Sequence, residues 1–71
     1  MMTRQRVTSS NIASIGYDSS TSTLEIEFNT GSIYEYSNVS SNINAALMSA
    51  SSHGTYFNAN IKGRYSFRQI K

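Results

Sequence analysis

Residues 23–28 read Thr-Leu-Glu-Ile-Glu-Phe, a strict alternation of apolar and polar side chains. Alternation with a period of two is typical of a β-strand that is buried on one face only. Asn29, Thr30 and Gly31 follow, and then residues 32–37, in which aromatic and apolar side chains recur. A three-residue hairpin loop commonly ends in a glycine in the left-handed conformation, and Gly31 stands at that place. The sequence therefore predicts a β-hairpin that turns at Gly31.

This turn also sets the register of the hairpin. It pairs Leu24 with Tyr36, Ile26 with Tyr34 and Phe28 with Ser32. Tyr34 and Tyr36 then lie on the apolar face, where we expect them to fill the core and to reach its wet rim with their hydroxyls. A slip of one residue would instead turn Ile33 and Glu35 toward the core. In the favoured register, the opposite face carries Ile33 and the acidic side chains of Glu25, Glu27 and Glu35.

The segments around the hairpin complete the predicted domain. Residues 1–8 are expected to form a flexible N-terminal arm, and residues 9–71 the folded domain. Ile12, Ile15 and Tyr17 indicate a first strand, and residues 18–22 supply Asp and Ser side chains that favour a turn.

The second half begins with a predicted helix. Ser40 or Ser41 is a suitable N-cap, and Gly54 is a natural helix stop. Between them, apolar residues recur with the spacing of one helical face: Ile43, Ala46, Leu47 and Ala50. Residues 55–71 can add a short helical turn and an edge strand, in which Tyr65 and Phe67 alternate with Arg64 and Arg68.

Composition limits the classes of protein to which the chain can belong. With 71 residues it forms at most one domain. It has no Cys and a single His, so disulfides, thiolate zinc and other metal or cofactor centres are not expected. No apolar run is long enough for a signal peptide or a membrane span, and we expect a soluble, cytoplasmic protein. Small domains without disulfides or structural metals often self-associate, which predicts a homo-oligomer.

Several short motifs resemble one known family. The first half contains Ile15-Gly16-Tyr17-Asp18, the alternating strand, Gly31 and Tyr34-x-Tyr36, and the second contains Gly54-x-Tyr56-Phe57-Asn58. Together they resemble the KTSC domain over roughly residues 8–68. This family is named after the C-terminal extension of some lysyl-tRNA synthetases, and it also occurs as short bacterial and phage proteins. Members usually have prolines where this chain has Ser40 and Ser41. The resemblance implies an α+β fold and, through the synthetase, a link to nucleic acid.

Charge is distributed unevenly along the chain. Residues 1–35 hold two arginines and four acids, a net charge of −2. Residues 36–71 hold no acid and a net charge of +4, from Lys62, Arg64, Arg68 and Lys71. The basic half can form an anion-binding surface, or it can fold against the acidic half and neutralise it.

The basic segment is the candidate nucleic-acid site. Cations neutralise phosphates and aromatic rings stack on unpaired bases, so Lys62, Arg64 and Arg68 with Tyr56 and Phe57 suit a single strand. Two other interpretations stay open. The arginines can instead balance Glu25 and Glu35, which face each other in the predicted register, and the aromatic residues can belong to the core or to a dimer contact.

No catalytic arrangement stands out. His53 lies near Ser51 and Ser52, but 14 serines make such proximity expected, and capping of the preceding helix suits His53 better. Glu25 and Glu35 on a flat sheet face lack the cleft that acid–base catalysis needs. The sequence thus predicts a small α+β domain, a three-stranded antiparallel meander packed on one helix with a C-terminal short helix and an extra edge strand. We expect a non-enzymatic module that binds RNA or single-stranded nucleic acid. The alternative is a protein-interaction module, such as a phage accessory protein acting on a host factor.

Overall fold

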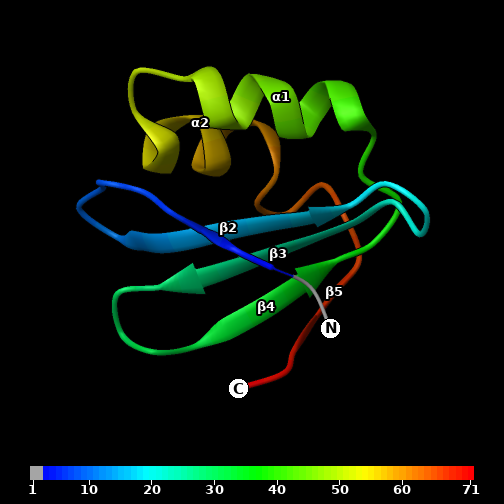
Figure 1. The fold of residues 1–71 in the computed structure, drawn as a ribbon, viewed down its shortest axis with the longest axis horizontal. Coiled ribbons are helices and arrows are strands. Elements are labelled where there is room, and N and C mark those ends of the chain that lie inside the picture. The colour runs from blue at the N-terminus through cyan, green and yellow to red at the C-terminus, as the bar shows by residue number, and fades with distance from the viewer. Residues whose placement is uncertain (1–2) are drawn as a thin grey trace.

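The computed structural model describes residues 3–71, with one antiparallel sheet and two helices that cover a single face of it (Figure 1). The strands follow one another across the sheet in chain order, β1-β2-β3-β4-β5. The elements are β1 (Gln5–Arg6), β2 (Ile12–Asp18), β3 (Thr23–Phe28), β4 (Ile33–Tyr36), α1 (Ser41–Ser49), α2 (His53–Asn60) and β5 (Phe67–Gln69).

The β3–β4 hairpin confirms the predicted register. Leu24 pairs with Tyr36, Ile26 with Tyr34, and Glu25 with Glu35. The loop closes through hydrogen bonds from the Gly31 N–H to the Phe28 carbonyl and from the Phe28 N–H to the Ser32 carbonyl, both 2.9 Å. Gly31 has φ +96°, a conformation that costs glycine little and other residues more.

Both helices begin at a serine cap. Of the two predicted caps Ser40 and Ser41, it is the Ser40 side chain that accepts from the Ile43 N–H at the start of α1. Ser52 accepts from the Thr55 N–H at the start of α2. The prediction that Gly54 ends the first helix was wrong, because α1 already ends at Ser49 and Gly54 lies buried inside α2. A Cβ at Gly54 would lie 2.3 Å from the Asn11 Oδ1, so the glycine allows α2 to approach the chain close to β2.

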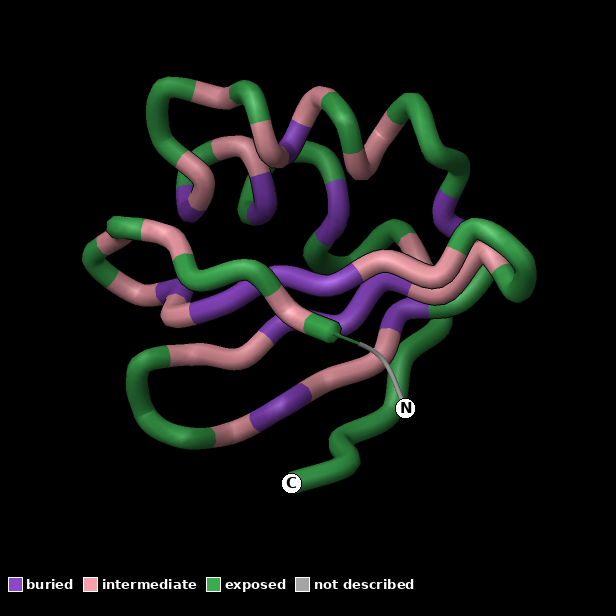
Figure 2. Tube along the Cα trace, in the orientation of Figure 1, coloured by how far each residue is buried: buried purple, intermediate pink, exposed green. Residues whose placement is uncertain are grey.

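The core lies between the sheet and the helices. Burial follows the central strands β2 and β3 and the inner sides of both helices, whereas the C-terminal stretch is exposed (Figure 2). The helices contribute Leu47 and Phe57, and the chain just after α2 contributes Ile61. From the sheet side come Ile12, Ile15, Leu24, Ile26 and Tyr36, with Val39 from the β4–α1 connection.

The sheet is wider than predicted. The three-strand meander is present as β2, β3 and β4, and the extra edge strand is present as β5, but β1 was not expected. Gln5 and Arg6 of the predicted N-terminal arm pair with Ile15 and Ser14 of β2. Met1 and Met2 of that arm lie outside the described residues. The predicted C-terminal short helix is present as α2, which spans eight residues.

Candidate functional site

The acidic side chains of the sheet lie on the face away from the helices. On the face away from the helices, register places Gly16 beside Glu25, Glu25 beside Glu35, and Glu35 beside Arg68. Arg4 precedes β1 at the edge of the same row. We call Arg4, Gly16, Glu25, Glu35 and Arg68 the charged row. Its two like-charged glutamates face each other, as the sequence predicted, and an arginine flanks each of them.

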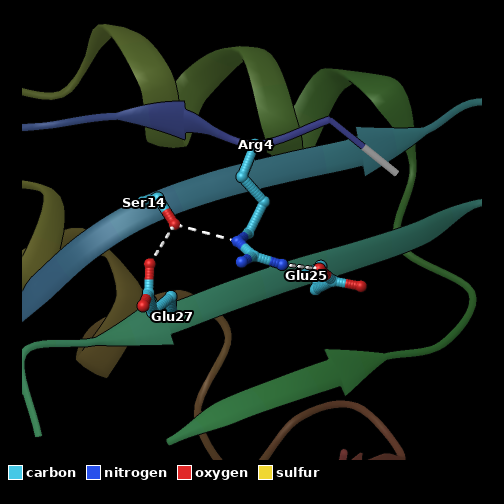
Figure 3. A network of polar contacts seen from close by, with 4 residues as sticks. All are labelled: Arg4, Ser14, Glu25 and Glu27. Atoms are coloured by element: carbon cyan, nitrogen blue, oxygen red, sulfur yellow. Dashed lines mark hydrogen bonds and ion pairs between the residues drawn. The ribbon is translucent and has the colours of Figure 1, made fainter. Parts of the chain in front are cut away.

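Arg4 holds the more buried glutamate (Figure 3). Its guanidinium forms an ion pair with the Glu25 carboxylate, and its Nε donates to the Ser14 Oγ at 3.0 Å. Ser14 in turn donates to the Glu27 Oε1 at 2.8 Å. Since Gly16 has no side chain, nothing projects from β2 between Arg4 and Glu25. Glu25 is only 7% exposed, so this pair neutralises a carboxylate that water barely reaches.

Arg68 holds the second glutamate at the opposite edge. Its Nε donates to the Glu35 Oε1 at 3.1 Å, and its side chain is largely exposed. Pairs of this kind contribute little to stability because solvent screens them. Because Arg68 contacts Glu35, the structure supports the interpretation that Arg68 balances the acidic face. Arg64 does not reach this face, because its Nε donates to the Ala59 carbonyl at the end of α2 at 3.2 Å.

The helix side of the sheet carries a cluster of five aromatic rings from β3, β4, β5 and α2. The Phe67 ring centroid lies 5.7 Å from those of Tyr34 and Tyr36, and the Phe57 centroid lies 5.5 Å from those of Phe28 and Tyr36. Edge-to-face and offset contacts at these distances are favourable. Burial raises the pKa of Tyr36 to about 12, so its hydroxyl remains protonated.

A groove opens over this cluster where the helices end and β5 remains uncovered. We call it the aromatic groove; it has a volume of about 480 Å³, within the range of ligand sites. Phe67 forms its open wall and is 58% exposed, whereas Phe57 is 3% exposed. It is lined by Phe28, Tyr34, Tyr36, Phe57 and Phe67, together with Asn11, Asn58, Lys62 and Gly63. No carboxylate lines it, and Lys62 forms no ion pair within residues 3–71.

The structure divides the predicted nucleic-acid residues between different places. Lys62 and Phe57 line the aromatic groove, although Phe57 exposes almost no surface for stacking. Tyr56 is half-buried against the core, and Arg68 lies on the opposite face of the sheet. Phe67, which the sequence placed only on one face of the edge strand, is the most exposed large apolar side chain in the described chain. Tyr36 is buried as predicted.

Other candidate residues have structural roles. The His53 Nδ1 lies 2.8 Å from the Leu47 carbonyl in the last turn of α1, the capping contact that was predicted. Hydrogen bonds from the side chain and backbone of Ser20 hold the pKa of Asp18 below its usual value. In residues 3–71, no three carboxylate, imidazole or thiol groups gather to hold a metal ion. Neither of the helices described is long and apolar enough to span a bilayer.

This combination of a sheet, one helical layer and a lined groove defines a small α+β domain with an open surface site. The family model of the KTSC domain matches residues 8–65. A crystal structure of a KTSC domain protein from Yersinia pestis is 42% identical, covers 100% of both chains and superposes with a TM-score of 0.97. The chain belongs to the KTSC domain family, as its motifs suggested.

Similar sequences occur both as a small part of a large enzyme and as most of a small protein. The lysine–tRNA ligase of Nostoc punctiforme is 43% identical over 59 residues, which is 83% of this chain and 10% of that protein. The chain thus matches about a tenth of the length of these ligases. An uncharacterized protein of Stutzerimonas stutzeri is 38% identical over 64 residues, 90% of each chain.

Proposed function

We propose that this KTSC domain is a non-enzymatic module that binds single-stranded nucleic acid, RNA or DNA, in the aromatic groove. The observation that carries the proposal is the exposed Phe67 ring beside Lys62 in a groove that no carboxylate lines. An aromatic ring stacks on unpaired bases of any sequence, and a nearby ammonium group neutralises phosphate.

The position of the acidic side chains supports the same ligand. Glu25, Glu27 and Glu35 all lie on the far face of the sheet, so they do not repel a phosphate backbone at the groove. Arg64 directly follows the groove residue Gly63 and adds a second cation to the same segment, with its guanidinium at the Ala59 carbonyl. The relatives named lysine–tRNA ligase are enzymes whose name specifies an RNA, which agrees with an RNA ligand for this chain.

Fluorescence anisotropy with labelled single strands of about ten nucleotides tests the proposal, at about 50 mM salt where electrostatic binding is strong. Phe67→Ala should weaken binding about tenfold, since stacking of one base is lost. Lys62→Gln should weaken binding and reduce the dependence of log K on log salt by about one. Arg68→Gln is the matched control, because its guanidinium pairs with Glu35 on the opposite face.

Three results would count against the proposal. The unmutated protein could fail to bind any single strand at low salt. Arg68→Gln could weaken binding as much as Lys62→Gln, which would remove the link to the groove. A duplex of the same sequence could bind as tightly as the single strand, although its stacked and paired bases cannot enter the aromatic groove.

The second candidate is a protein-interaction module. It is favoured by two exposed apolar side chains at the free edge of the sheet, Phe67 of β5 and Ile70 directly after it, which are 58% and 43% exposed. Such residues on an edge strand are suited to contact a partner protein or a second copy of the chain. Sedimentation of the protein alone measures self-association, and retention of one defined protein that Phe67→Ala and Ile70→Ser abolish would favour this function.

A further inference from the structure

The outer edge of β5 presents backbone groups that the sheet does not use. Ser66 and Ile70, on either side of β5, hydrogen-bond to the chain of β4 at 2.9 and 2.8 Å. Backbone bonds alternate along an antiparallel pair, so Arg68 also faces β4, whereas the N–H and C=O groups of Phe67 and Gln69 point away from it. Because β5 is the last strand of the sheet and all of its residues are exposed, these donors and acceptors line an open edge (Figure 1).

The side chains at this edge differ between the two faces of the sheet. Phe67 presents its exposed ring on the helix side, and Arg68 projects from the opposite face with most of its side chain exposed. The Nε of Arg68 donates to Glu35, which leaves the N–H groups of both terminal nitrogens for a second carboxylate. A strand that lies beside β5 therefore meets an aromatic ring on one face and a guanidinium on the other.

We propose that β5 receives an extended acidic segment of a partner protein as a further strand, with apolar side chains against Phe67 and carboxylates opposite Arg68. Strand addition of this kind takes its affinity from main-chain hydrogen bonds and its specificity from alternate side chains. Directly paired residues have their side chains on the same face, so the apolar residues of the partner are those that hydrogen-bond to Phe67 and Gln69. The inference rests on the second candidate function, to which it gives a partner of defined chemistry, and not on nucleic-acid binding.

Two other occupants fit this edge less well. The phosphate groups of a nucleic acid accept hydrogen bonds but donate none, so they leave the outward carbonyls of β5 unpaired. A second copy of the chain would bring a β5 segment whose charges are all positive, since residues 36–71 contain no acid. Like charges on neighbouring strands are unfavourable, and cationic side chains on an exposed edge oppose self-pairing. An acidic segment is attracted by the same charges.

The test uses a fluorescein-labelled peptide of about ten residues in which valine and glutamate alternate, long enough to form one strand. Anisotropy is measured at about 50 mM salt, where exposed charges are weakly screened. Two further peptides carry N-methyl groups on all valines or on all glutamates, so each loses the backbone donors of one edge only. Methylation of the valines should weaken binding about tenfold, and methylation of the glutamates should leave it within about twofold.

The matched variants of the protein change one backbone donor. Gln69→Pro removes an outward N–H and keeps the bonds between β4 and β5, because the N–H of Gln69 does not face β4. It should weaken binding of the unmethylated peptide about tenfold, whereas Gln69→Thr, which keeps the N–H, should stay within about twofold of the unmutated chain. Circular dichroism of each variant verifies that the fold is retained.

Charge variants separate this edge from the aromatic groove. Arg68→Gln should weaken peptide binding about threefold and leave oligonucleotide binding unchanged. Lys62→Gln, which changes the groove, should weaken oligonucleotide binding and leave peptide binding unchanged. A peptide with lysine in place of every glutamate should lose measurable binding to the unmutated chain.

Several results would overturn the inference. The unmethylated peptide could fail to bind, the two methylated peptides could bind equally well, or Gln69→Pro could bind the peptide as tightly as the unmutated chain. Self-association in sedimentation that Gln69→Pro abolishes would assign the edge to a second copy of the chain and would also overturn it. Peptide binding without any oligonucleotide binding would instead remove the function proposed for the aromatic groove and leave this inference standing.

Discussion

Replacement of Arg4 by Met should destabilise the domain strongly, although Arg4 lies outside the regular elements. The substitution keeps most of the apolar stem and removes the guanidinium, so the Glu25 carboxylate loses its ion pair while it still faces Glu35 across the hairpin. The side chain of Glu25 is 9% exposed and that of Arg4 27%, so the pair lies between the buried and the surface cases. Loss of one partner costs about 3–5 kcal/mol in a buried pair and less than about 1 kcal/mol in an exposed one. We expect a loss of about 2 kcal/mol in the free energy of unfolding.

Urea denaturation followed by circular dichroism measures this loss. With a slope of about 1 kcal/mol/M for a domain of this size, the midpoint should fall by about 2 M. Glu25→Gln in the Arg4→Met background should recover about half of the loss, because a neutral amide costs less to bury than an unpaired carboxylate. The double-mutant cycle of Arg4 and Glu25 isolates their coupling.

Arg64→Met provides the matched control, since Arg64 is an exposed arginine that contacts the Ala59 carbonyl and no carboxylate of the described chain. Its free energy of unfolding should change by less than about 0.5 kcal/mol. If Arg4→Met were no more destabilised than Arg64→Met, or if Glu25→Gln restored nothing, the role assigned to the charged row would be wrong.

Three further substitutions test local features of the fold. Ser40→Ala should lower the free energy of unfolding by about 1 kcal/mol through loss of the α1 cap, whereas Ser41→Ala, one residue inside the helix, should change it by less than half as much in the same urea titration. Gly54→Ala should force the Asn11 amide to move, because the new Cβ would lie 2.3 Å from its Oδ1. Thermal melting should show a lower melting temperature for Gly54→Ala, and adding Asn11→Ala should largely restore it. An equal drop in melting temperature with Asn11 and with Ala at position 11 would contradict the contact. Asp18→Ala should be less stable than the unmutated chain at neutral pH, because the pKa of Asp18 is lower in the folded chain than in the unfolded one. The difference in stability should be present above about pH 4 and vanish as the pH falls through the folded pKa. A difference that grows in acid would refute this reasoning.

The parts of the fold that follow from local chemistry could be predicted from the sequence. Alternation in residues 23–28 and the position of Gly31 determine the hairpin and its register, and Ser40 marks the start of α1. Strand β1 could not be found in this way, because Gln5–Arg6 is too short and polar to show alternation. It exists because Arg4 and β2 hold it in place. Gly54 was misinterpreted because its reason is a contact with Asn11, far away in the sequence.

The candidate site, like the fold, could be predicted from the sequence only in part. Lys62 could be selected from its charge and its aromatic neighbours. The exposure of Phe67 could not be predicted, because its alternation with Arg68 only fixes the face of the sheet on which the ring lies. Whether that face is covered depends on how far α1 and α2 extend over the sheet, and they leave β5 open (Figure 1). The sequence left open whether Arg68 contacts a ligand or balances Glu25 and Glu35, because only the pairing of β4 with β5 brings Arg68 beside Glu35.

The charged row also bears on where the family's domain boundary can be drawn. The family model begins at residue 8, after both β1 and Arg4. A fragment that starts there would retain every motif of the family and the whole aromatic groove. It would nevertheless expose the edge of β2 and leave Glu25 without its cation. Arg4 and β1 are therefore part of the folding unit, and the family match alone would set the boundary a strand too late.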